Sequence, residues 1–228
     1  MRLQASCAAL AAAIATLATA GAASAQEWDV AFNAAATSDY VFRGASQSNE
    51  NFALSGGVDA TYGGFYVGGW ASQVDFGDDT SAEIDTYGGY RAEAGGFALD
   101  FGVIGYFYTD APSAGDYDYV EYKAAASRAI GPLTAGVAVY YSPDFFGVDE
   151  TATYLEANAA VTPIDKVTIS GAVGKQWLDV TGDYVTWNVG ASYALTDNLA
   201  FDVRYHDTDV DNAPLYDGRV NATLKLAF

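Results

Sequence analysis

The chain has almost no cysteine and few basic residues. Its 228 residues include one Cys, one His and 5 Pro, and 10 Lys and Arg residues stand against 29 Asp and Glu, a net charge of −19. The single cysteine, Cys7, precedes an apolar N-terminal run, so the chain beyond it has no thiol for a disulfide framework or a thiolate metal site. No basic stripe is present, which argues against nucleic acid as a partner.

Long hydrophobic runs and cofactor motifs are also missing. After residue 25 no stretch has 18 consecutive apolar residues, so no helix is expected to cross a membrane. A membrane-embedded chain without such a helix must form a closed β-barrel, because only helices and barrels satisfy every backbone group in lipid. No phosphate-binding loop, dinucleotide fingerprint or zinc spacing is found, and no cofactor is expected.

The N-terminus has the pattern of a secretory signal. Arg2 precedes the alanine-rich run Ala8 to Ala20, and Ala23-Ser24-Ala25 fits a small-x-small cleavage site. The run is too short and too alanine-rich for a transmembrane anchor, which is the alternative. We therefore expect a signal peptide at residues 1–25 and a single barrel domain at 26–228. Removal of Arg2 with the signal changes the net charge from −19 to −20.

The full chain is rich in Gly (24), Tyr (17) and Phe (12), and the part after residue 25 alternates in polarity with a period of two. Glycine-rich or proline-containing breaks divide it into twelve expected strands: 28–42, 52–62, 65–74, 83–93, 97–108, 119–127, 133–142, 151–161, 167–176, 184–195, 199–206 and 219–228. Most lengths lie near the roughly 9–11 residues of a tilted membrane strand. Short and long connections alternate, as in outer-membrane barrels.

These features predict a transmembrane antiparallel up-and-down β-barrel of about twelve strands, with both termini in the periplasm of a bacterium that has an outer membrane. The last strand, Val220 to Phe228, alternates strictly and ends on an aromatic residue, as do strands that the barrel-assembly machinery recognises. A soluble β-sandwich is the alternative. It explains less well the aromatic residues near the strand ends and the small residues on the polar face.

Charge parity identifies the residues expected to face the lumen, because a basic residue facing lipid at midplane costs about 2–4 kcal/mol. Lys175 is the exception, and its position beside a loop allows the side chain to reach the interface. The expected lumen residues are the acids Asp39, Asp59, Asp85, Glu93, Asp100, Glu121, Glu156 and Asp202 and the bases Arg43, Arg91, Lys123, Arg204, Arg219 and Lys225.

Two hypotheses about the pore follow from these charges. Eight acids against six bases give the lumen wall a charge of about −2, so most of the negative charge lies in loops and rims, where it favours cations within about 8–10 Å. The wall charges would form ion pairs that narrow the pore, or have a purely structural role. Asp39 and Arg43, four residues apart on one expected strand, are a candidate structural or gating pair.

Other motifs are weak. Asp207-x-Asp209-x-Asp211 resembles the start of a calcium loop, but Asn212 and Gly218 stand where an EF-hand has Gly and Glu. The alternative to a calcium site is a solvated acidic loop, and divalent cations that bridge such loops to lipopolysaccharide are a further hypothesis. His206, the single histidine, has lumen parity and no nearby G-x-S-x-G motif, which argues against a lipase-like hydrolase.

The first hairpins resemble a known family. The segments are Ser38-Asp39-Tyr40-Val41-Phe42-Arg43-Gly44, Ser46-Gln47-Ser48, Gly56-Gly57, Gly64-Phe65-Tyr66-Val67-Gly68, Trp70, Val74-Asp75-Phe76 and Glu83-x-Asp85-x-Tyr87-Gly88-Gly89-Tyr90. They resemble the opening signature of the TorF-family porins of proteobacteria, over roughly the first third of the expected mature chain. This chain has Phe52-Ala53 where the family has a proline. The resemblance implies an outer-membrane porin and no particular substrate.

The sequence therefore predicts a non-enzymatic outer-membrane porin for passive diffusion of small solutes or ions, with a weak preference for cations. Expected partners are outer-membrane lipid, lipopolysaccharide and the assembly machinery, and a homo-oligomer of the porin type is left open. The alternative is a closed barrel with a structural or surface-interaction role. An enzyme is the third class.

Overall fold

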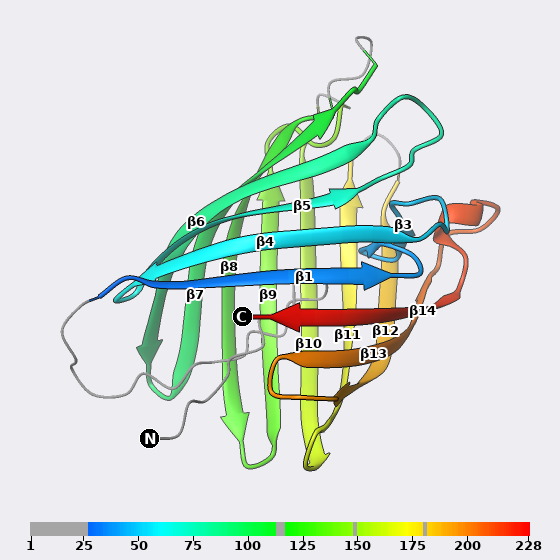
Figure 1. Cartoon of the computed structure of the whole chain (residues 1–228). Helices are drawn as coiled ribbons and strands as arrows, with labels where there is room; N and C mark the ends of the chain where they lie inside the picture. Colours follow the sequence, from blue (N-terminus) through cyan, green and yellow to red (C-terminus); the bar gives the residue numbers. More distant parts are fainter. Residues whose placement is uncertain (1–26, 113–116, 148–149, 180–181) are drawn as a thin grey trace.

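The computed structural model describes residues 27–112, 117–147, 150–179 and 182–228. Twelve strands form one closed barrel, in the order β1-β14-β13-β12-β11-β10-β9-β8-β7-β6-β5-β4 (Figure 1). The wall strands are β1 (Asp29–Thr37), β4 (Ala53–Tyr62), β5 (Phe65–Gln73), β6 (Ala82–Ala94), β7 (Phe97–Thr109), β8 (Tyr119–Ile130), β9 (Leu133–Ser142), β10 (Ala152–Ile164), β11 (Val167–Leu178), β12 (Tyr184–Ala194), β13 (Leu199–Thr208) and β14 (Arg219–Ala227).

Each wall strand pairs antiparallel with its neighbours, and the first and last strands close the barrel. The β1–β14 register runs from Asn33↔Ala227 to Thr37↔Thr223. Two backbone bonds extend it, from Phe32 N to Phe228 O at 2.7 Å and from Phe228 N to Phe32 O at 3.0 Å. Closure leaves no free sheet edge, so no edge backbone group is left without a hydrogen-bond partner in the membrane. The predicted twelve-stranded meander is confirmed.

Alternation along each strand separates two faces of the wall. In β13, Phe201, Val203 and Tyr205 are exposed outside, while Asp202, Arg204 and His206 are buried inside. The same period runs through the other wall strands, so large apolar side chains cover the outer surface. An apolar outer belt on a closed sheet is the surface of a transmembrane barrel of the outer-membrane type. Lys175 lies on the outer face beside a loop, where it pairs with Asp183 at 3.2 Å.

Short and long connections lie at opposite ends of the barrel. The end with short connections, here the turn end, carries the turns at 63–64, 95–96, 131–132, 165–166 and 195–198, together with the start of β1 and the end of β14. The longer connections form the loop end. The predicted signal peptide lies outside the described residues. Within those residues, no helix has the length and apolar character to cross a bilayer, and the short 3₁₀ turn η1 (Pro214–Tyr216) lies in the last loop.

The first predicted strand is wrong at its end. β1 stops at Thr37, and residues 38–52, here the inner loop, turn back into the barrel instead of continuing the wall to Phe42 (Figure 1). The inner loop contains a small hairpin of β2 (Val41–Phe42) and β3 (Ala45–Ser46). The apolar residues Tyr40 and Phe42 continue the alternation of β1, but they pack inside the barrel and do not face lipid.

Candidate functional site: the inner loop and the lumen wall

The inner loop is fixed to the wall at its start. The Ser46 hydroxyl donates to Asp39 Oδ1 at 2.6 Å, and Arg219 of β14 bonds Asp39 Oδ2 at 3.2 Å. Asn221, the next inward residue of β14, donates to the Asp39 carbonyl at 3.1 Å. Asp39 therefore ties the base of the hairpin to β14, the strand that closes the barrel against β1.

Tyr40 packs the loop against the wall formed by β4, β5 and β6. Its ring meets Trp70 edge-on at 5.4 Å, within a buried cluster that includes Ala53 and Val74. Its hydroxyl donates to Glu83 Oε1 of β6 at 2.8 Å. An apolar body and a bonded polar tip are what a buried tyrosine needs.

The hairpin turns through Arg43 and Gly44. Both have positive φ, 47° and 85°, as a two-residue turn of type I′ requires. A Cβ on Gly44 would collide with Thr186 of β12 and Thr208 of β13, so the tip of the hairpin touches that wall directly. Only glycine combines this backbone conformation with so close an approach.

Arg43 reaches from the tip of the hairpin to the far wall. It binds Glu121 of β8 in a bidentate pair, with Nη1–Oε1 at 2.7 Å and Nη2–Oε2 at 2.8 Å. Nη1 also donates to Gln176 of β11 at 3.1 Å, and the guanidinium lies 4.3 Å from the Tyr154 ring centroid and 5.0 Å from that of Tyr140. The Arg43 and Glu121 side chains are only 5% and 1% exposed.

These contacts correct the predicted Asp39–Arg43 pair: Asp39 binds Arg219 and Arg43 binds Glu121. The two residues lie at opposite ends of a hairpin that crosses the lumen, not on one wall strand. With the edge contact between Phe42 and Tyr106 of β7, the loop touches each strand from β5 round to β14. The inner loop therefore narrows the lumen across its width.

A group of carboxylates lies beside the loop. Glu83 of β6 accepts from the Tyr40 and Tyr108 hydroxyls, each at 2.8 Å. Asp85, two residues further along the same face, is 5% exposed, and its Oδ1 has no hydrogen-bond partner. The sequence predicted Asp85 as a lumen residue but passed over Glu83, although the parity they share was the signal that could have identified it.

Towards the turn end, the predicted residues of β6, β7 and β8 form a second group. Lys123 donates to Asp100 at 2.9 Å, Arg91 Nε lies 3.6 Å from the same carboxylate, and the Tyr66 hydroxyl donates to it at 2.7 Å. The Arg91 guanidinium also stacks 4.2 Å from the Tyr66 ring centroid. Glu93 continues this face of β6 and is exposed.

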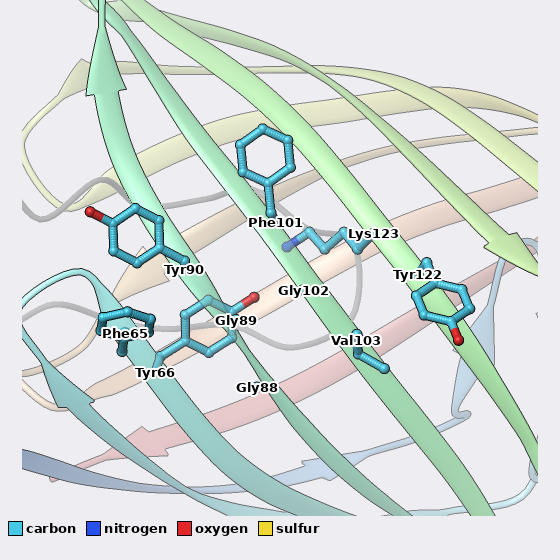
Figure 2. Close-up of a pocket in the computed structure, with 10 residues that line it drawn as sticks. All are labelled: Phe65, Tyr66, Gly88, Gly89, Tyr90, Phe101, Gly102, Val103, Tyr122 and Lys123. Atoms are coloured by element: carbon cyan, nitrogen blue, oxygen red, sulfur yellow. The ribbon is translucent and has the colours of Figure 1, made fainter.

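Glycines in the wall make room for Tyr66. Its ring lies against Gly89 and Gly102, where any side chain would collide with its hydroxyl group. Outside this thin part of the wall is a hollow of about 540 Å³ between Phe65, Tyr90, Phe101, Val103 and Tyr122 (Figure 2). Those side chains belong to the apolar outer belt, so the hollow is part of the lipid-facing surface and separate from the inner loop.

The other predicted lumen residues have partners on the wall. Arg204 bonds Asn188 and Ser170, each at 2.7 Å, and Asp202 at 3.3 Å, and Lys225 lies within electrostatic reach of Asp202. Glu156 accepts from Asn158 at 2.9 Å and Tyr154 at 3.1 Å, and Asp59 accepts from Tyr87 at 2.7 Å. Whether these residues act in permeation remains a prediction.

Aromatic side chains gather at the loop end. Phe146 stacks on Tyr117 at 4.7 Å and meets Phe76 and Tyr108 edge-on at 5.5 and 5.4 Å, which joins three loops. Beside them, hydrogen bonds from Thr80 and Tyr117 hold the pKa of Asp78 below its usual value, and the same bond to Asp78 raises the pKa of Tyr117. These loops form a small packed cap with an acidic surface.

The structure gives no support to the calcium-loop-like segment at residues 207–212 or to a hydrolase role for His206. Asp209 accepts from the Val185 backbone amide at 2.7 Å and Asp207 from that of Thr208 at 2.9 Å, so both carboxylates bind backbone. Among the described residues, no group of three His, Cys, Asp or Glu side chains is placed to hold a metal ion. His206 is buried on the inner face, whereas the Ser-His pair of an outer-membrane lipase lies outside the wall.

Solved structures similar to this chain are outer-membrane porins and channels. A KdgM porin has a TM-score of 0.60 with 11% identity, covering 87% of this chain and 99% of that one. KdgM porin in complex with disordered oligogalacturonate gives 0.58 with 12% identity, covering 87% and 98%. The COG4313 outer membrane channel from Pseudomonas putida F1 gives 0.54 with 10% identity, covering 92% and 98%. At these identities the likeness establishes the fold.

Among proteins of curated function, none matches this sequence. A family described as bacterial proteins of unknown function, Gcw_chp, matches residues 19–227, nearly the whole chain. This match places the chain in a bacterial family. The likeness to porins and channels establishes the barrel fold, and the narrower resemblance to TorF-family porins remains a prediction. The chain belongs to the Gcw_chp family.

Proposed function

We propose that this protein is a narrow outer-membrane channel for ions and small solutes, with its bore set by the inner loop. The observation that carries the proposal is the inner-loop hairpin, which crosses the lumen and is bonded to the wall on both sides, by Arg43 to Glu121 of β8 and by Asp39 to Arg219 of β14. A twelve-stranded barrel is already narrower than the 16–18-stranded porins with open aqueous channels. The hairpin reduces the space further, so large substrates are excluded.

A preference for cations is supported by where the charges lie. Five of the six predicted lumen bases form ion pairs with carboxylates, and the sixth, Lys225, lies within electrostatic reach of Asp202. By contrast, many acids of the loop end are exposed: Glu50, Asp78, Asp79, Asp110, Asp118, Asp144, Glu150, Asp179, Asp183, Asp209, Asp211 and Asp217. A mouth of one sign raises the local concentration of counter-ions. The oligogalacturonate in the KdgM complex is an anion, and this mouth favours the opposite charge.

The second candidate is a closed barrel with a structural or surface-interaction role and no enzymatic activity. It is favoured by the same loop, because the contacts from β5 round to β14 leave little room for a path. The acidic loops would then be the functional surface, in contact with lipopolysaccharide through bridging cations. A porin-type homo-oligomer is compatible with either function.

Conductance separates these two functions. Thr37 and Ala53 are register partners, so residues 38–52 can be replaced by a two-residue Asn-Gly turn that closes β1 onto β4. In planar bilayers we expect small discrete steps from the refolded wild type and larger steps from the shortened variant. Steps from the shortened variant alone would identify a sealed barrel. No steps from either, with both folded and heat-modifiable on a gel, would contradict the channel.

We also propose that the barrel-assembly machinery recognises the last strand. Phe228 stacks on Phe32 at 6.0 Å and remains 65% exposed, while Val220 and Leu224 are exposed on the same outer face. Phe228→Ala should reduce the heat-modifiable fraction of the protein in outer membranes of a bacterial host. An unchanged fraction would remove this residue from recognition.

A further inference from the structure

The carboxylates beside the inner loop carry more negative charge than the described contacts neutralise. Glu83, Asp85 and Glu121 are 2%, 5% and 1% exposed, and Asp85 lies within electrostatic reach of both glutamates. Among the described residues, Arg43 is the one base bonded to this group, through Glu121. With all three ionised, these carboxylates would exceed the one guanidinium by about two negative charges, and buried charges must be compensated.

Hydrogen bonding does not supply the compensation at Asp85. Three of the nearby hydroxyl donors are used elsewhere, since Tyr40 and Tyr108 donate to Glu83 and Tyr106 donates to Glu121 at 3.1 Å. Asp85 Oδ1 is left without a partner on the inner face of the wall. A carboxylate that is 95% buried and has one oxygen without a donor offers an acceptor for a positive charge.

The groups around Asp85 suit a small cation. In the register of the sheet it stands between Trp70 of β5 and Tyr106 of β7, both buried inward-facing aromatics. Aromatic faces attract cations, and more strongly where water is excluded. No set of three acidic, His or Cys ligands is assembled in the described part of the chain, so no chelating cage for a divalent metal is formed.

We propose that Asp85, supported by Glu83 and Glu121, is a binding site for a monovalent metal cation beside the inner loop. A cation held by one carboxylate, without a full set of chelating ligands, binds weakly and exchanges readily. Ion conduction requires binding of this kind. The binding itself is independent of channel function. Its role as a station on the ion path rests on the channel proposed above.

Thermal unfolding tests the binding without relying on conductance. The probe is Na⁺, compared with N-methyl-D-glucamine as the chloride salt at the same ionic strength, with the refolded full-length mature barrel in detergent. A cation bound only by the folded barrel raises Tm by mass action. We expect Na⁺ to raise Tm of the wild type, and the rise to be lost in Asp85→Asn. Asp197→Asn, in the exposed turn between β12 and β13, is the matched control that removes the same charge.

Each outcome bears on the proposal. A rise that persists in Asp85→Asn places the cation elsewhere and overturns it. If Na⁺ does not change the wild-type Tm at either pH 6 or pH 8, the compensating charge is a proton. This result also overturns the proposal. If Asp85→Asn does not refold, Asp85→Ser is the second variant for the Tm comparison. Sodium NMR on the wild type then tests separately whether the folded barrel binds ²³Na⁺ that K⁺ displaces.

Ion selectivity in planar bilayers is a second measurement of the cation site. If the wild type conducts, Asp85→Asn should reduce the permeability ratio of K⁺ over Cl⁻ by about threefold or more, with Asp197→Asn unchanged. If the wild type is folded but does not conduct, the channel function fails, while the Tm comparison still decides the cation site.

Discussion

Arg43 is the residue through which the inner loop reaches the opposite wall. Its bidentate pair with Glu121 is buried, and removal of one partner of a buried ion pair leaves an uncompensated charge. Arg43→Met should therefore lower the free energy of unfolding by about 3–5 kcal/mol. The measurement is urea unfolding in lipid vesicles followed by tryptophan fluorescence.

A double-mutant cycle gives the control for Arg43. Glu121→Gln keeps an acceptor for the Tyr106 hydroxyl but removes the charge. The Arg43→Met/Glu121→Gln variant should be more stable than Arg43→Met alone, because no carboxylate is then left buried without its partner. Additive losses would show that the two side chains contribute independently.

A comparison of alanine substitutions at Gly44 and Gly95 separates the cost of backbone strain from the cost of steric contact. Gly44→Ala combines a φ of 85° with collisions against Thr186 and Thr208, whereas Gly95→Ala, in the turn between β6 and β7, has φ of 61° and no atom within 4 Å. Strain alone should cost Gly95→Ala about 1–2 kcal/mol of unfolding free energy. Gly44→Ala should lose more and also increase single-channel conductance by loosening the hairpin. Equal losses would mean that the tip does not press on β12 and β13.

At the scale of the strand, most of the barrel wall can be predicted from the sequence. A lipid-facing strand must alternate strictly, so the inward positions of Asp202 and Arg204 follow from parity alone. The inner loop could not be found in the same way. Tyr40 and Phe42 alternate like wall residues because a hairpin inside a barrel also needs apolar side chains to pack, here against Trp70 and Tyr106.

The partners of the lumen charges were also beyond sequence reasoning. Parity predicted that Arg43 and Glu121 would face inward, but 78 residues separate them in sequence, and only barrel closure and the turn at Gly44 bring them together. The unpartnered state of Asp85 depends likewise on which hydroxyls reach Glu83 and Glu121. Such pairings depend on the shape of the loop, which polarity patterns do not encode.

The depth of a strand position in the membrane sets the cost of a charge on the outer face. Val203 lies midway along β13, and Val220 lies near the loop end of β14, both exposed outward. Val203→Arg should destabilise the barrel in lipid vesicles by about 2–4 kcal/mol, and Val220→Arg by about 0–1 kcal/mol. Urea unfolding of both variants measures the difference. Equal costs would argue that the membrane does not centre on the middle of the strands.

At the scale of the whole molecule, the charges lie in two environments. The carboxylates of the loop end are exposed to solvent, whereas those beside the inner loop are buried. Salt screens exposed charges strongly and buried charges much less. A channel that used both sets would have two components of cation selectivity, and ionic strength can separate them.

Reversal potentials at two mean salt concentrations measure these components. The Debye length falls from about 30 Å at 0.01 M to about 3 Å at 1 M, so the contribution of the loops should be lost at high salt. We expect the permeability ratio of K⁺ over Cl⁻ to fall as salt rises and to level off above one. Replacement of the exposed Asp79, Asp211 and Asp217 by Asn should lower the ratio at low salt and leave the high-salt value unchanged. Asp85→Asn should lower the ratio at both salt concentrations, because its charge is buried beside the hairpin and salt screens it little. A ratio independent of salt in the wild type would assign selectivity to the buried wall alone and leave the acidic loops without a part in permeation.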